Sequence, residues 1–183
     1  MGKTPTSRES PGPGRGMKPS GRRRSGKRTA PPDVRERQRP GDVERAARLV
    51  LRTDGAARGN PGPSSAGIVV EDADGKALSR MGRLLGRGTN NEAEYRAAIL
   101  ALEEALRRGA GEVALMTDSQ LLAFQVKGVY RIKAGNLRPL LARLRELLAG
   151  FECWEVLHVP RSDNREADRM ANRALDEQAD VDG

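Results

Sequence analysis

Two short segments of the chain share one plan, in which a run of apolar residues ends in Thr-Asp and is followed by small polar residues. In the first segment the acid is Asp54, preceded by LVLRT, and in the second it is Asp118, preceded by VALMT. Each segment is typical of a buried strand that presents an acid at its carboxyl end. If the two strands are parallel neighbours, both acids emerge at the edge of the sheet where ligands bind in open α/β folds.

Two further acids lie in conspicuous polar runs, Glu94 in TNNEAEY and Asp168 in NREADRMAN. A cluster of such hard oxygen ligands is suited to holding Mg²⁺ or Mn²⁺ against a phosphate. Taken singly, each acid has an ordinary structural explanation: Asp54 in a turn, Asp118 as a helix cap, Glu94 near a helix dipole and Asp168 as a solvated helix charge. It is the joint occurrence of the four runs that favours a metal site.

The composition of the chain changes near position 45. Residues 1–40 contain 12 Lys and Arg against 3 Asp and Glu, a net charge of +9, and 7 of the 11 prolines, whereas the whole chain carries +8. A segment with so few apolar residues cannot bury enough surface to offset its ordering entropy. We therefore expect residues 1–44 to be a disordered basic tail rich in Pro, Gly and Arg, and residues 45–183 to be one folded domain.

The chain carries few features of secretion or membrane insertion. Its single cysteine, Cys153, excludes an internal disulfide and fits a reducing compartment. No apolar stretch approaches the ~20 residues of a membrane span, and the basic N-terminus lacks the apolar core of a secretory signal. These observations predict a cytoplasmic protein without a membrane partner.

Hydrophobic periodicity predicts nine elements in the order βββαβααβα. We expect strands at 49–54, 66–70, 77–85, 112–117 and 154–159, with a Gly/Pro loop at 55–63 between the first two. We expect helices from the cap Thr89 to Gly109, then at 119–126, 136–150 and 164–178. The pattern predicts an α/β fold with a five-stranded mixed sheet flanked by helices. The residues expected to be buried on these helices are Tyr95, Ile99, Leu102 and Leu106 on the first, Leu137, Leu140, Leu141, Leu144, Leu147 and Leu148 on the third, and Ala167, Met170, Ala171 and Ala174 on the last.

The four acidic runs, together with GNPGP and DSQ, resemble type I ribonuclease H in content and order over residues 48–178. The resemblance is closest to the compact subgroup without a basic protrusion, because the connector at 127–135 is too short to form one. It implies a ribonuclease H-like fold with three antiparallel strands followed by two parallel ones. It also implies an endoribonuclease that hydrolyses the RNA strand of RNA–DNA hybrids with two Mg²⁺ or Mn²⁺ ions, leaving 5′-phosphate and 3′-hydroxyl ends.

The resemblance also implies roles for individual residues. The catalytic and metal-binding residues are the four acids, Asp54, Glu94, Asp118 and Asp168. Substrate contacts fall to backbone and amide groups that can read the 2′-hydroxyl, and to residues near phosphates. The sole histidine, His158, falls within the fifth predicted strand and is interpreted as a packed or edge residue. The implied substrate-binding residues are Gly55, Ala57, Asn60, Thr89 (which would serve equally as a helix cap alone), Asn90, Asn91, Ser119, Gln120 and Arg161.

Two alternative functions stay open at this point. One is a module that binds RNA–DNA hybrids or R-loops without cleaving them, which the four intact acids argue against. The other is a DNA nuclease of the same superfold, which the set of 2′-hydroxyl-reading amides argues against. For the expected enzyme, the partner is an RNA–DNA hybrid, and we expect a monomer without an obligate protein partner.

Overall fold

The computed structural model describes residues 48–183, so the predicted tail at residues 1–44 lies outside the described residues. All described residues belong to the compact unit Arg39–Gly183. The strands are β1 (Arg48–Ala57), β2 (Gly62–Glu71), β3 (Ala77–Gly88), β4 (Glu112–Thr117), β5 (Cys153–His158) and β6 (Val181–Asp182). The helices are α1 (Asn90–Arg107), α2 (Gln120–Val126), α3 (Leu137–Leu148) and α4 (Arg165–Glu177), with a 3₁₀ turn at Arg161–Asp163.

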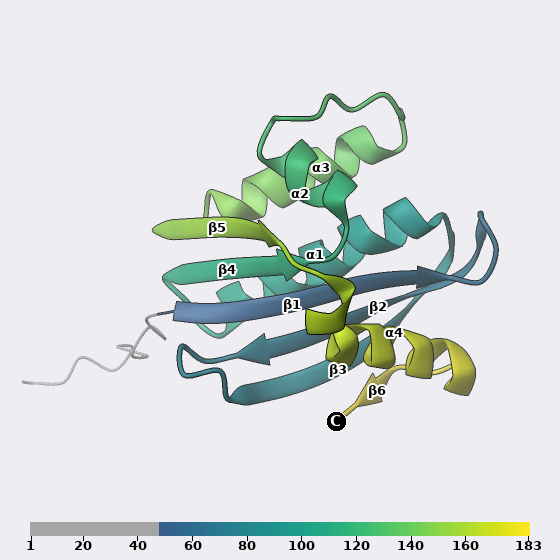
Figure 1. The fold of residues 1–183 in the computed structure, drawn as a ribbon, viewed down its shortest axis with the longest axis horizontal. Coiled ribbons are helices and arrows are strands. Elements are labelled where there is room, and N and C mark those ends of the chain that lie inside the picture. The colour runs from purple at the N-terminus through teal and green to yellow at the C-terminus, as the bar shows by residue number, and fades with distance from the viewer. Residues whose placement is uncertain (1–47) are drawn as a thin grey trace, which may run out of the picture. The chain divides into compact units, whose positions relative to one another are not determined.

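The strands form one mixed sheet in the order β5-β4-β1-β2-β3-β6 (Figure 1). The pairs β1–β2, β2–β3 and β3–β6 are antiparallel, whereas β1–β4 and β4–β5 are parallel. This confirms the predicted α/β ribonuclease H-like class. The predicted count of five strands is wrong, because Val181–Asp182 adds a sixth strand by pairing with Met81 and Gly82. Two residues are too few to produce an alternation that sequence can reveal.

The β1–β2 hairpin is longer than the sequence predicts. The expected loop at 55–63 is partly strand, since Gly55, Ala56 and Ala57 pair with Ala66, Ser65 and Ser64. The sequence does not predict this extension, because its residues are small or polar and show no apolar alternation. The extension is formed by backbone pairing. The hairpin therefore reaches past Asp54, which lies inside β1 rather than at its end.

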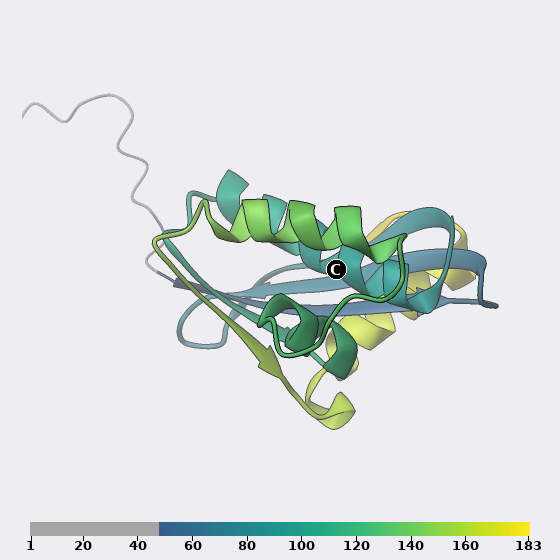
Figure 2. The same ribbon diagram turned by 90° about the horizontal axis from the view of Figure 1, so that it is seen from above.

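Helices cover both faces of the sheet: α1 and α3 lie on one face and α4 lies on the other (Figure 2). The main core lies between the sheet and the α1–α3 layer, where Leu51, Leu115 and Leu144 are fully buried. Tyr95 and Leu102 of α1 are buried as predicted, but Ile99 and Leu106 are only partly so, because alanines form much of the inner face of this helix. The stripe on α3 is buried except for the partly buried Leu140.

The packing of α4 depends on two glycines that are paired across β2 and β3, Gly67 and Gly82. A Cβ atom at Gly67 would lie 1.9 Å from the Ala167 carbonyl oxygen, and one at Gly82 would lie 2.4 Å from that of Met170. The helix backbone therefore rests directly on the sheet. The predicted burial of Ala167, Met170, Ala171 and Ala174 is confirmed. The start of α4 lies beside β1, because the Asn164 side chain donates a hydrogen bond to the Thr53 carbonyl oxygen.

Across residues 48–183, no helix combines the length and the apolar character that a membrane crossing requires.

Candidate active site

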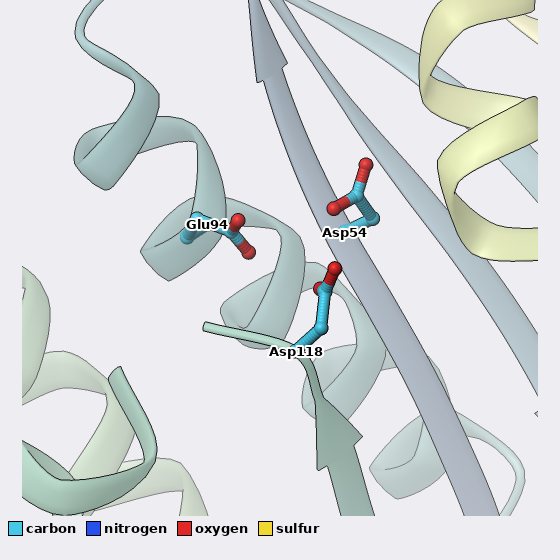
Figure 3. Close-up of side chains that lie close together, drawn as sticks. All are labelled: Asp54, Glu94 and Asp118. Atoms are coloured by element: carbon cyan, nitrogen blue, oxygen red, sulfur yellow. The ribbon is translucent and has the colours of Figure 1, made fainter. Parts of the chain in front are cut away.

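Three of the four predicted acids meet at one place in the fold. One carboxylate oxygen each from Asp54, Glu94 and Asp118 lies within 4.8 Å of the others. Figure 3 shows Asp54 on β1, Glu94 on α1 and Asp118 just beyond β4, with their carboxyl groups turned toward a common region. Parallel pairing places Thr53 opposite Thr117, so the residue that follows each, Asp54 and Asp118, occupies the same level of the sheet. The expected proximity of Asp54 and Asp118 is confirmed, although Asp54 lies within β1 and only Asp118 follows the end of its strand.

Glu94 enters the cluster from the second turn of α1. The helix begins at Thr89, whose hydroxyl accepts a hydrogen bond from the Glu92 backbone at 3.2 Å, while the Glu92 carboxylate accepts one from the Thr89 backbone at 2.8 Å. Gly55 sets the distance between this helix and β1, because a Cβ there would lie 2.1 Å from the Glu94 backbone nitrogen. The Gly55 backbone also lowers the pKa of Glu94 slightly, against the larger effect of burial. Because Gly55 has no side chain, α1 can approach β1 closely enough to bring Glu94 beside Asp54.

Burial and mutual repulsion make these acids weak in the absence of a cation. Burial first, then the charges of Asp118 and Asp168, raise the pKa of Asp54 to about 7. Burial first, then the charges of Asp54 and Asp118, raise the pKa of Glu94 well above its ordinary value. The Oε2 atom of Glu94 is buried and accepts no hydrogen bond from any residue of 48–183. Three hard oxygen donors with one orphaned oxygen fit a divalent cation, which would compensate the charge that the protein leaves unpaired.

Asp168 lies in the first turn of α4, outside the close group of three. Its Oδ1 atom accepts a hydrogen bond from the Arg161 guanidinium at 2.6 Å. This contact raises the pKa of Arg161, to which the charges of Asp54 and Asp118 also contribute. Because Asp168 raises the pKa of Asp54, it is electrostatically part of the same site. The Arg161 guanidinium therefore lies at the acid cluster, paired with one of its members.

Asn164 is a site residue that the sequence did not single out. It is fully buried, and its Nδ2 atom donates to the Thr53 carbonyl at 2.9 Å and to Asp118 Oδ1 at 3.0 Å. The sequence indicated only that a helix starts there. Asn164 does stand at the N-cap of α4, but its side chain makes no capping bond and turns to the acid cluster instead. Asparagine at a helix start is so common that no signal distinguished this one.

The predicted substrate-binding residues lie around the acids, at the starts of α1 and α2 and in the β1–β2 hairpin. Asn91 and Gln120 are exposed. Asn60 accepts a hydrogen bond from the Asn90 backbone at 3.3 Å and so joins the hairpin turn to α1. Two other members have structural duties, since Thr89 caps α1 and Ser119 caps α2. Of the remaining members, Gly55 faces α1, Ala57 is half-buried in β1 and Arg161 is exposed.

His158 is the last residue of β5 and is exposed. Its Nε2 atom lies 3.2 Å from the Asp118 backbone carbonyl oxygen, and its ring lies near that of Phe124. An edge position in the strand agrees with the sequence interpretation. The alternation of residues along the strand did not indicate that His158 would lie next to Asp118 of the acid cluster.

Comparisons with known proteins agree on one family. A family model described as reverse transcriptase-like matches residues 52–174. The chain is similar to ribonuclease HI of Halobacterium salinarum, with 45% identity over 134 residues that cover 73% of this chain and 67% of the relative. It is also 40% identical over 130 residues to a bifunctional protein of Mycobacterium tuberculosis, covering 70% of this chain. The chain spans only 36% of that mycobacterial relative.

Solved structures give the same result. The crystal structure of RNase H1 from Halobacterium salinarum has a TM-score of 0.70 at 45% identity, with 72% of this chain and 99% of that chain covered. LC11-RNase H1, solved in complex with an RNA/DNA hybrid, has a TM-score of 0.68 at 36% identity, with 71% and 98% covered.

Proposed function

Because the chain belongs to the type I ribonuclease H family, whose members are RNA–DNA hybrid ribonucleases, we propose that it hydrolyses the RNA strand of RNA–DNA hybrids. We propose further that divalent cations at the acid cluster support the reaction and that the products carry 5′-phosphate and 3′-hydroxyl ends. One observation carries the proposal: Asp54, Glu94 and Asp118 bring carboxylate oxygens within 4.8 Å of one another. The hybrid bound in the LC11-RNase H1 structure supports this substrate class.

The residues that would hold two Mg²⁺ or Mn²⁺ ions are Asp54, Glu94 and Asp118, joined by Asp168. When bound, these ions would lower the pKa of the attacking water and neutralise charge at the phosphate and the departing oxygen. Asp168 would join the group on exchanging its present partner, the Arg161 guanidinium. The released guanidinium would then be free to contact a phosphate oxygen of the substrate.

The other residues of the site orient the acids and recognise the sugar. Asn164 holds the Asp118 carboxylate through its amide, with a hydrogen bond of 3.0 Å. Burial of Asp54 and Glu94, each 6% exposed, keeps water away and strengthens their attraction for a cation. Exposed amides at Asn91 and Gln120 offer both donors and acceptors to a 2′-hydroxyl, which distinguishes RNA from DNA.

The test is cleavage of matched hybrid, duplex RNA and duplex DNA by the full chain, with Mg²⁺ and with Mn²⁺. We expect cleavage of the RNA strand of the hybrid, and end analysis of the products reports which oxygen leaves. Asp118→Asn should lower turnover by several orders of magnitude with the fold intact, because it removes charge without changing shape. The control is Asp74→Asn, since Asp74 lies in the exposed β2–β3 turn. Normal cleavage by Asp118→Asn would contradict the site, and cleavage of duplex DNA instead would contradict the substrate.

A further inference from the structure

The outward side of α4 carries a row of three arginines. Arg165, Arg169 and Arg173 follow one another at four-residue intervals, so they lie on the same side of the helix, one turn apart. All three are exposed. We call them the α4 arginine row. It begins in the first turn of α4, the turn that also carries Asp168 of the acid cluster.

An open hollow of about 510 Å³ lies along this side of the helix. The hollow starts at Asp168, and Asn172 donates a hydrogen bond to the Asp168 carbonyl oxygen at 2.9 Å within it. A ligand in the hollow would therefore be continuous with a ligand at the acids. The lining residues are Asp168, Arg169, Asn172, Arg173, Asp176 and Glu177.

Arginines outnumber the acidic residues of α4 once the neighbouring elements are included. Each of these acids already has an arginine partner: Asp168 with Arg161, Glu166 with both Arg80 and Arg169, Asp176 with Arg58, and Glu177 with Arg173. Five arginines thus pair with these four acids. Arg165 is a sixth arginine nearby, and it makes no ion pair with any residue of 48–183. Solvent-exposed pairs of this kind are weak, so the guanidinium groups can exchange a carboxylate for a phosphate at little cost.

We propose that the α4 arginine row binds the sugar–phosphate backbone of the RNA strand beyond the cleavage site. The proposal rests on the proposed function, because the strand held at the acids is taken to be RNA. From Arg165 to Arg173 the row rises by eight residue steps of helix, about 12 Å. This length corresponds to three or four phosphates of one strand at roughly 3.4 Å per step along the duplex axis. The hollow therefore matches a short run of backbone that leaves the acid cluster.

The experiment compares two double variants of the full chain that remove the same charge. Arg169→Gln/Arg173→Gln changes side chains that are 70% and 46% exposed, each paired with a glutamate of the same helix. Arg107→Gln/Arg143→Gln is the matched control in the α1–α3 layer, with side chains 70% and 45% exposed. Each pairs with a glutamate of its own helix, and Arg143 also pairs with Glu103 of α1. Cleavage of a long hybrid is measured over a range of salt concentrations.

For the α4 double variant we expect kcat within about twofold of wild type and apparent KM raised on the order of tenfold, since no group at the reacting atoms is lost. The slope of log KM against log salt should fall by about 2, one for each lost phosphate contact. The control variant should leave the apparent KM and its salt slope unchanged. If the two double variants behave alike, the proposed binding role of the α4 arginine row is wrong, while the proposed function stays intact. A wild-type chain that cleaves no hybrid would overturn the function itself.

A second arm identifies the strand. Neutral methylphosphonate linkages are placed in the RNA-containing strand beyond the cleavage site, or in the DNA strand opposite. If the row binds the RNA strand, only the first substrate removes the difference between wild type and the α4 double variant. Loss of the difference with the neutral DNA strand would overturn the assignment.

Discussion

Gly55 lies directly beneath Glu94: a Cβ atom at Gly55 would lie 2.1 Å from the Glu94 backbone nitrogen and 2.3 Å from the carbonyl carbon of Ala93. The contact joins the strand that carries Asp54 to the helix that carries Glu94. No flexible side-chain end is present at this point to move aside, because the neighbouring atoms are backbone. The distance between the candidate metal ligands Asp54 and Glu94 is therefore set by the small size of Gly55, the residue that follows Asp54.

Gly55→Ala should separate α1 from β1 and carry Glu94 away from Asp54. We expect a loss of about 1–3 kcal/mol in the free energy of unfolding, the usual cost of overpacking. We also expect a smaller rise of the melting temperature on adding Mg²⁺, together with slower cleavage. Gly135→Ala is the control, since nothing lies within 4 Å of a Cβ there. A Gly55→Ala protein with wild-type Mg²⁺ stabilisation would show that this contact does not position Glu94.

Asn164 is expected to hold Asp118 in place for the site. Asn164→Ala would leave the Thr53 carbonyl and Asp118 Oδ1 without their amide donor in a buried setting. We expect unfolding to become easier by about 1–3 kcal/mol, and Mg²⁺ to stabilise the variant less than it stabilises wild type. Calorimetric melting with and without Mg²⁺ measures both effects. Asn172→Ala, which removes one exposed bond on the same helix, should change neither; equal effects of the two changes would contradict the role.

The sequence was sufficient for those parts of the site that depend on one strand or helix at a time. The apolar runs before Asp54 and Asp118 predicted two buried strands, and parallel neighbours must bring their following residues together. It could not indicate the inward turn of Asn164 or the strand at Val181–Asp182. These features depend on partners 46 and about 100 positions away, and nothing in their local pattern differs from an ordinary helix start or chain end.

Recognition of RNA should depend on the two exposed amides at Asn91 and Gln120. Both side chains are exposed and therefore accessible to substrate. Replacing both with alanine removes contacts on the order of 1 kcal/mol each. We expect the ratio of kcat/KM for hybrid over duplex DNA to fall about tenfold or more, with the melting temperature unchanged. An unaltered ratio in the double variant would exclude these amides as readers of the 2′-hydroxyl.

The basic tail predicted at residues 1–44 yields a test that depends on its charge alone. Residues 1–40 carry a net charge of +9, so we expect their deletion with residues 41–44 to weaken nonspecific attraction to phosphates. Turnover at saturating hybrid should stay the same, because no candidate catalytic residue is removed, whereas apparent KM should rise and its salt dependence should flatten. Identical KM values and salt slopes for full-length and truncated protein would mean that the tail has no role in binding.

Stability of the metal-free protein should fall as the pH rises from about 4 to about 7. The pKa of Asp54 is raised to about 7 in the fold, and that of Glu94 is raised well above its ordinary value. The folded state therefore keeps protons that the unfolded chain has already lost in this window, and the free energy of unfolding decreases with pH wherever the folded state binds more protons. For Asp54 alone the penalty at neutral pH is roughly 4 kcal/mol.

Mg²⁺ should reverse this trend, because a cation replaces the protons on Asp54 and Glu94. Binding should then release protons and tighten as the pH rises from 6 to 8. Titration calorimetry in two buffers of different ionisation enthalpy measures the released protons, and urea unfolding at pH 5 and pH 8 measures the stability. Asp54→Asn should be more stable than wild type at pH 8 without metal, equal to it near pH 4, and insensitive to Mg²⁺. A wild-type stability that rises with pH in the absence of metal would contradict the raised pKa of these acids, and with it the account of why the cluster attracts a cation.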